Sequence, residues 1–140
     1  MTKFPPGRPT YCSIDHAALR WNLQQIRAKV GARVKILSMV KANAYGHGAA
    51  AVAKTLLAAG GDALGVATLD EGIELRQSGI GAPIIVVAGV YADQLEQFFA
   101  HSLTPVIYDL NGLTELEAAV EKRRATLDAF QRRLRVPSSR

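Results

Sequence analysis

The residue best placed to do chemistry is Lys41, which ends the apolar run Val34–Lys41 and precedes the turn Gly46-His47-Gly48. The carboxyl ends of parallel strands carry the active sites of α/β proteins. Partial burial beside Met39 and Val40 would favour the neutral form of an amine, which attacks carbonyl groups. The sequence therefore predicts a nucleophilic lysine suited to an aldehyde cofactor such as pyridoxal phosphate, with an ordinary surface lysine as the alternative.

The turn after Lys41 adds a phenol and an imidazole. Tyr45 could donate a hydrogen bond to a phosphate oxygen, because amides at the start of the next helix favour an anion there. Packing of the Tyr45 ring at the rim is the alternative. His47, between Gly46 and Gly48, is predicted to satisfy the loop backbone rather than to act as an acid or base.

The other candidate residues carry weaker signals. His16 and His101 are predicted on helix surfaces, and the histidines show no metal-ligand spacing, so no metal site is predicted. Cys12 is the single cysteine, which excludes an internal disulfide and suits a reducing compartment. It is predicted to be a small packing residue.

Hydrophobic periodicity predicts a leading strand and helix followed by four βα units. Apolar runs predict strands over Thr10–Ile14, Val34–Lys41, Ala63–Ala67, Ile84–Ala88 and Thr104–Tyr108. Helices are predicted between Asp15, as N-cap, and Gly31, over Ala49–Ala59, from Asp70 to Gly79, over Ala92–His101 and from near Asn111. The run Val34–Lys41 lacks alternation, which indicates a strand covered on both faces. The last helix has apolar residues at a 3-4 spacing, interrupted by Arg123, and could pack on a sheet with one face.

Two parallel-sheet architectures fit this order of elements. An open, doubly wound sheet of four or five strands can be completed by 140 residues. A (β/α)8 barrel needs about 250 residues. From the pattern alone, the open sheet is favoured.

Composition narrows the class of protein. No apolar stretch reaches the roughly 18 residues of a membrane helix, and the first residues lack a signal-peptide core, so a soluble, cytoplasmic protein is expected. The net charge of +5 comes from residues 121–140, which hold seven Lys and Arg against Glu121 and Asp128. A solvated helix face is favoured over a nucleic-acid arm. An interaction protein with a basic tail is an alternative that rests on these residues alone.

The segment Met39–Gly48 resembles the pyridoxal-phosphate signature of the alanine racemases. Ser13-Ile14-Asp15, with Leu19, Asn22 and Leu23, is similar to the opening of that family. Further similarity lies in Gly65-Val66-Ala67 with Asp70-Glu71-Gly72 and Leu75-Arg76, and in Ala82–Val86. The resemblance extends from about residue 8 to residue 110 and fades after about residue 120.

This resemblance reverses the choice of architecture. It implies an α/β chain that forms the N-terminal half of a (β/α)8 TIM-type barrel, about four βα units and incomplete. In the family, a C-terminal β domain follows the barrel. The predicted divisions are an irregular lead-in over 1–9, a partial barrel domain over 10–136 and a tail over 137–140.

The resemblance also implies a function. An alanine racemase interconverts L-alanine and D-alanine, which supplies D-alanine as a peptidoglycan precursor. Lys41 would bind pyridoxal 5'-phosphate as an aldimine and exchange the α-proton on one face of alanine, and Tyr45 would bind the cofactor phosphate. The family works as a homodimer. A non-catalytic pyridoxal-phosphate-binding protein and a broader-specificity amino-acid racemase are the alternatives.

Several parts that the family requires are missing from this chain. The second acid–base group is, in the family, a tyrosine of the partner's C-terminal domain, and no segment here matches it. The arginine facing the pyridine nitrogen and the later barrel strands are also missing. Residues 122–140 match nothing in the family. We therefore expect a truncated or frameshifted racemase that is inactive alone.

Overall fold

The computed structural model describes residues 12–134, and the side chains of residues 12–126. Four parallel strands form one sheet in the order β1-β2-β3-β4. The strands are β1 Leu37–Met39, β2 Ala63–Val66, β3 Ile84–Val86 and β4 Thr104–Pro105. The predicted lead-in over 1–9 and tail over 137–140 lie outside the described residues.

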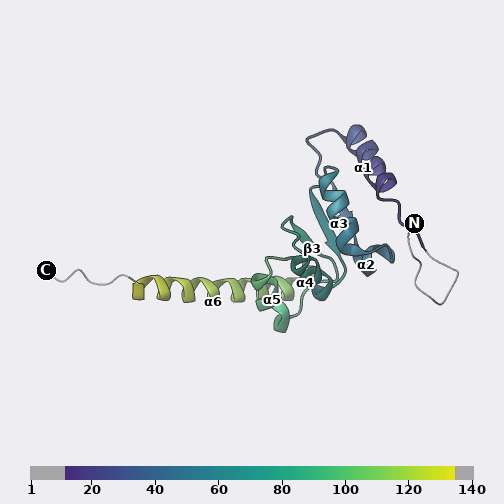
Figure 1. The fold of residues 1–140 in the computed structure, drawn as a ribbon. Helices are drawn as coiled ribbons and strands as arrows, with labels where there is room; N and C mark the ends of the chain where they lie inside the picture. Colours follow the sequence, from purple (N-terminus) through teal and green to yellow (C-terminus); the bar gives the residue numbers. More distant parts are fainter. Residues whose placement is uncertain (1–11, 135–140) are drawn as a thin grey trace.

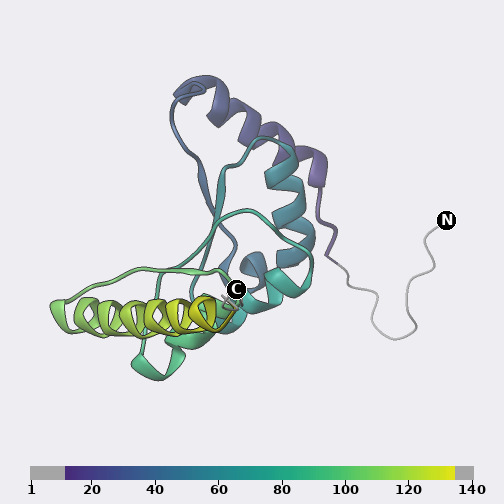
Figure 2. The ribbon, with the colours of Figure 1, turned by 90° about the vertical axis from the view of Figure 1, so that its left-hand side faces the viewer.

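Helices alternate with these strands, which confirms the predicted α/β class and the four βα units. They are α1 His16–Val30, α2 Lys41–Tyr45, α3 Ala49–Ala58, α4 Leu69–Gln77, the 3-10 turn η1 Ala92–Gln94, α5 Leu95–Ala100 and α6 Leu110–Leu134. Asp15 caps α1 as predicted, because its carboxylate accepts hydrogen bonds from the amides of Ala17 and Ala18. Helices α1 and α3 lie side by side (Figures 1 and 2). Within the described residues, no helix is long and apolar enough to cross a membrane.

The core lies on one face of the sheet. In-register positions such as Leu64 and Ile84, and Val66 and Val86, are at most 1% exposed. On the other face Leu37 is 43% exposed, and Met39 and Ile85 are half-buried. The prediction that the strand within Val34–Lys41, which is β1, is covered on both faces is therefore wrong for this chain. The helices pack over one face, and the other is the face that would line the inside of a barrel.

Close packing on that second face explains Gly65. A Cβ atom at this position would lie 2.2 Å from Sδ of Met39 on the neighbouring strand. A side chain at this position would therefore have to displace the flexible end of Met39, and glycine leaves room for Met39 to lie across β2.

The strands are shorter than predicted. The run Val34–Lys41 forms a strand only over Leu37–Met39, where it pairs with Ala63–Gly65. The run Thr104–Tyr108 pairs over two residues. Cys12–Ile14 are not in a strand, and Thr10 and Tyr11 lie outside the described residues. The length of a strand is set by how many of its residues pair with the neighbouring strand, and the apolar composition of a segment does not predict that number.

The last helix departs most from expectation. α6 projects away from the sheet (Figure 1), and its main contacts are with α5 and η1. The prediction that one face of it packs on the sheet is wrong. In a βα barrel, the helix after a strand covers the groove to the next strand. Within the described residues β4 is an edge strand, so α6 has no such groove to cover.

Two hydrogen-bonded clusters, each centred on a charged side chain, hold the amino edge of the sheet, which is the edge opposite Lys41. The first is centred on Asp62, before β2. Its carboxylate accepts hydrogen bonds from the Ile36 amide at 2.9 Å, from the Arg27 guanidinium, and from Nζ of Lys35 at 3.1 Å. These bonds, the one from Ile36 foremost, hold the pKa of Asp62 well below its usual range.

Arg76 is the centre of the second cluster, before β3 and β4. Its guanidinium donates to the carbonyls of Ile80 and Ala82 ahead of β3, and to those of His101 and Ser102 ahead of β4, at 2.6–2.9 Å. Burial lowers the pKa of this guanidinium. The fork of five donors suits arginine for holding several carbonyls at once.

Replacing Asp62 by asparagine is expected to destabilise the fold at about pH 7 and to destabilise it less at about pH 3. The folded-state pKa of Asp62 is depressed, so its stabilisation is full above the unfolded-state pKa of about 3.9 and is lost progressively as the pH falls from there through the folded-state pKa. Urea unfolding followed by circular dichroism at both pH values measures the difference. Asp93→Asn, at an exposed position, is the matched control. An Asp62→Asn deficit of equal size at both pH values would contradict the assignment.

Candidate functional site

The candidate site lies at the carboxyl edge of the sheet. Because the four strands are parallel, the segments that follow them meet at this one edge. Lys41 follows β1, Thr68 follows β2, and Gly89 and Tyr108 follow β3 and β4. The topology therefore places Lys41 on the edge where the sequence predicted it.

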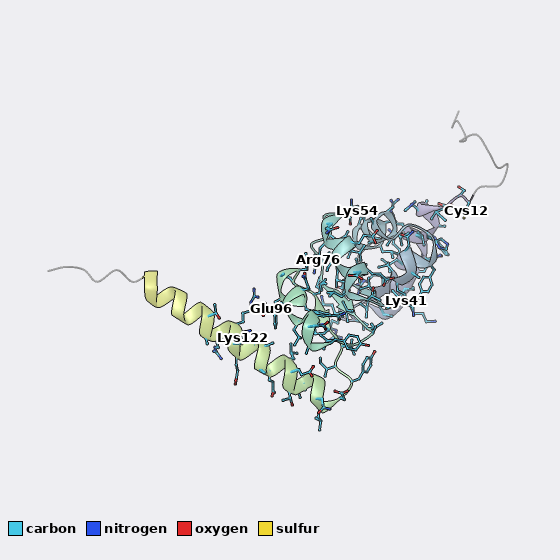
Figure 3. The ribbon with its side chains drawn as sticks, turned by 90° about the horizontal axis from the view of Figure 1, so that it is seen from below. Cys12, Lys41, Lys54, Arg76, Glu96 and Lys122 are labelled. Carbon is cyan, nitrogen blue, oxygen red and sulfur yellow. The ribbon has the colours of Figure 1, made fainter. Side chains whose placement is uncertain are left out.

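Lys41 does not end a strand, contrary to the prediction. The strand ends at Met39, Val40 is 1% exposed, and Lys41 opens the short helix α2 as a half-buried residue. Figure 3 shows Lys41 on the body of the molecule, away from α6 and Lys122. The burial of Val40 anchors the backbone one residue before the amine.

The backbone after Lys41 is left-handed. Ala42, Asn43, Ala44 and Tyr45 have φ angles of 50–53°, where residues with a Cβ atom rarely lie. This conformation costs roughly 1–2 kcal/mol per residue. Gly46, with φ of 83°, continues it without that cost. Strain of this kind persists only where surrounding contacts impose it, and it concentrates at functional sites.

Two side chains stabilise this turn: Glu71, which lies on α4, and Asn43, which lies in the turn itself. Glu71 in the first turn of α4 accepts a hydrogen bond from the Ala42 amide at 2.6 Å and one from the Ala67 amide at 2.7 Å. One carboxylate thus joins the turn after β1 to the end of β2. Asn43 accepts from the Ala49 amide at 2.7 Å, which joins the same turn to the start of α3.

Tyr45 lies on this turn, four residues after Lys41, and its side chain is 58% exposed. His47 Nδ1 lies 3.0 Å from the carbonyls of both Ala44 and Tyr45. Since both neighbours are acceptors, Nδ1 carries the proton. The prediction that His47 satisfies the loop backbone is confirmed. The turn therefore presents an amine, a phenol and the start of α3 within nine residues.

The remaining candidates have structural roles or none. His16 Nδ1 lies 2.7 Å from Oγ1 of Thr55, so this half-buried residue links α1 to α3 instead of lying free on a helix surface. Cys12 is exposed, and the prediction that it packs is wrong because residues 12–15 are not in the sheet. Within the described residues, no three His, Cys, Asp or Glu side chains cluster as metal ligands would.

A cavity of about 170 Å³ opens at the same edge, beside the ends of β3 and β4. Its lining includes Gly89, Tyr91, Tyr108 and Asp109. The Tyr108 hydroxyl donates to the carbonyl of Val87, and a Cβ at Gly89 would touch the Tyr108 ring at 3.4 Å. Sequence reasoning missed this cavity, since β4 was predicted to continue through Tyr108.

Sequence reasoning also missed the positioning roles of Glu71 and Asn43. The pattern Thr68-x-x-Glu71 is a capping box, and the structure confirms that Glu71 lies in the first turn of α4. The capping-box pattern in the sequence predicts only the hydrogen bonds that Glu71 makes at the start of its own helix. The bond to Ala42 spans 29 residues and depends on the pairing of β1 with β2.

Replacing Glu71 by alanine is expected to release the turn. Within the described residues Glu71 alone accepts a hydrogen bond from the Ala42 amide. Its loss should speed hydrogen exchange there by about tenfold, which corresponds to one hydrogen bond. Amide exchange measured by NMR at Ala42 and Ala67 tests this. Glu74→Ala, at an exposed position of the same helix, is the control. Unchanged exchange at Ala42 in Glu71→Ala would rule out the positioning role.

The sequence and the fold of this chain are both similar to those of known proteins. Residues 14–130 match the family described as "Alanine racemase, N-terminal domain". The alanine racemase of Halothermothrix orenii is 46% identical over 100 residues, which are 71% of this chain and 26% of that protein. The chain thus spans about a quarter of the length of this relative.

Two solved structures share the fold. The alanine racemase of Bacillus anthracis with bound L-Ala-P has a TM-score of 0.70 and 32% identity, over 77% of this chain and 29% of that one. The alanine racemase of Bartonella henselae with covalently bound pyridoxal phosphate has a TM-score of 0.74 and 25% identity, over 79% and 31%. These likenesses confirm the predicted partial barrel and correct the open sheet that the pattern alone favoured.

Proposed function

The chain belongs to the alanine racemase N-terminal domain family, and we propose that it is the lysine-bearing half of an alanine racemase site. In this proposal, Lys41 holds pyridoxal phosphate and Tyr45 binds the phosphate group. The substrate is alanine in either configuration. A cytoplasmic location and a role in supplying D-alanine remain predictions that accompany this function.

The observation that carries the proposal is the left-handed turn that begins directly after Lys41. Four strained residues fix the backbone beside a half-buried amine at the carboxyl edge of a parallel sheet. Glu71 on α4 accepts a hydrogen bond from the Ala42 amide of the turn, and Asn43 within the turn accepts one from the Ala49 amide at the start of α3. Both bonds hold the geometry of the turn. A lysine with a purely solvating role needs no such support.

The chemistry of the donors fits pyridoxal phosphate. An amine suits its aldehyde, a phenol hydroxyl suits a phosphate oxygen, and the start of the ten-residue helix α3 favours a negative charge nearby. When bound, the cofactor withdraws electrons from Cα of the amino acid, which makes the α-proton removable. Lys41 would hold the cofactor and then move that proton to and from Cα on one face, with Nζ as the base.

Racemisation requires an acid–base group on each face of Cα, and Lys41 serves one face only. The chain covers about a quarter of the H. orenii relative. We propose that the group for the opposite face is supplied by protein outside this sequence. The isolated chain would then bind the cofactor without racemising alanine.

Cofactor trapping tests the proposed site. The purified chain is incubated with pyridoxal phosphate, reduced with borohydride and mapped by mass spectrometry. We expect labelling at Lys41 in preference to the other five lysines. Tyr45→Phe is expected to weaken cofactor binding about tenfold, which is the loss of one hydrogen bond. Lys54→Ala, at an exposed position on α3, is expected to leave labelling unchanged. Labelling spread evenly over the lysines would refute the site.

D-Alanine formation tests the reaction. The chain alone is expected to show none above the rate of free pyridoxal phosphate. A polypeptide carrying the remainder of a relative's sequence is expected to restore activity, and Lys41→Ala in the same mixture should abolish it. Selective labelling of Lys41 without restored activity would favour a non-catalytic cofactor-binding protein. Racemisation by the unaided chain would contradict the need for a second part, and faster turnover of another amino acid would favour a broader specificity.

A further inference from the structure

The imidazole of His47 folds back on the two residues that precede Gly46. Its Nδ1 lies 3.0 Å from the carbonyl oxygen of Ala44 and 3.0 Å from that of Tyr45, and it donates its proton to both. The glycines on either side of His47 have φ angles of 83° for Gly46 and 90° for Gly48. Glycine adopts such angles without steric cost, so the chain can reverse here and return the ring to the turn that precedes it.

The carbonyl of Tyr45 depends on this contact. The other three carbonyls of the left-handed turn accept hydrogen bonds from main-chain amides at 2.9–3.0 Å; they are those of Ala42, Asn43 and Ala44, bonded to Gly46, Gly48 and His47. Among the described residues, His47 Nδ1 is the one group that donates to the Tyr45 carbonyl. The residue that carries the phenol is thus held by a side chain, whereas the carbonyls before it are held by the backbone.

A donor shared by two successive carbonyls favours the left-handed form of the turn. Carbonyls of successive residues point to the same side in a helical backbone and to opposite sides in an extended strand. One N–H can therefore reach both Ala44 and Tyr45 only while these residues stay helical, here with φ angles of 53°. Without such a contact, extended backbone is the less costly state for a residue that has a Cβ atom.

The backbone of Tyr45 determines where its phenol lies. Ala44 is 4% exposed and is anchored in the core, whereas the side chain of Tyr45 is 58% exposed and is held only in part by packing. The direction in which Cβ leaves the main chain follows from φ and ψ of that residue. A change of Tyr45 from left-handed to extended backbone would therefore move the phenol to another side of the turn.

We propose that His47 is a positioning residue for Tyr45. Its Nδ1–H bond to two carbonyls keeps Tyr45 left-handed, and this fixes the direction in which the phenol leaves the turn. The role rests on the proposed function, in which Tyr45 binds the phosphate group of pyridoxal phosphate. His47 itself touches neither the cofactor nor the substrate in this proposal, and it contributes to phosphate binding only through Tyr45.

Two probes that differ only in the phosphate group test this role. Equilibrium dialysis measures Kd of the full chain for pyridoxal phosphate and for pyridoxal, which lacks the phosphate. His47→Ala is expected to weaken the binding of pyridoxal phosphate about tenfold, as for the loss of one hydrogen bond, and to leave the binding of pyridoxal unchanged. His47→Asn should restore most of the loss, because its amide N–H lies at about the position of Nδ1. His101→Ala, at a half-buried position on the amino edge, is the matched control and should change neither Kd.

A double variant tests whether His47 acts through Tyr45. Adding His47→Ala to Tyr45→Phe is expected to cause no further loss of affinity for pyridoxal phosphate, because the phenol hydroxyl that His47 positions is already absent. Fully additive losses would overturn the proposal. Equal weakening of both probes by His47→Ala would also overturn it, since it would show a general loosening of the turn around Lys41.

The backbone of Tyr45 gives a readout that needs no cofactor. The nuclear Overhauser effect between the amide proton and Hα of the same residue is strong when φ is positive. We expect this strong effect at Tyr45 in the parent chain and in His47→Asn, and a clearly weaker one in His47→Ala. An unchanged effect in His47→Ala would refute the role of His47 whether or not the cofactor binds. A parent chain that binds no pyridoxal phosphate would instead refute the proposed function.

Discussion

The left-handed turn over Ala42–Tyr45 is the constraint on which the site depends. Its cost is offset by hydrogen bonds from two other elements, through Glu71 of α4 and through Asn43 to α3. The turn can therefore exist only when β1 and β2 are paired and α4 is in place. The geometry around Lys41 is accordingly a product of the fold and not of the decapeptide alone, although that decapeptide carries the most specific resemblance in the sequence.

The sheet has one covered face, one partly exposed face and two edge strands in the described structure. Its buried face holds the core, while Leu37, Met39 and Ile85 lie on the face that a complete barrel would enclose. β1 and β4 each have one neighbour in the described structure. Unpaired strand edges and apolar faces favour association with further protein. The same incomplete surroundings leave α6 without a groove to cover.

Local rules predicted much of this structure. Asp15 as a cap, Glu71 in a first turn, and the order of the βα units follow from short-range hydrogen bonding and periodicity. Strand lengths could not be predicted, because the run ending at Lys41 reads as one apolar strand whereas pairing with β2 limits it to Leu37–Met39. The left-handed turn also escaped prediction: alanine and tyrosine have no preference for positive φ, and the bonds that impose it are distant in sequence. The packing of Cys12 and the docking of α6 on the sheet were wrong, since each assumed a neighbouring strand that the described structure does not supply.

The clusters at Asp62 and Arg76 have a consequence for how this chain tolerates change. Both lie on the amino edge, where one ties the loops before β1 and β2 and the other those before β3 and β4. Strand spacing is thus secured by charged side chains on the rim that is remote from Lys41. These charged ties and the proposed site lie on opposite rims of the sheet. Mutational robustness can therefore be engineered at the amino rim, by strengthening these ties, without altering the residues of the proposed site at the carboxyl rim.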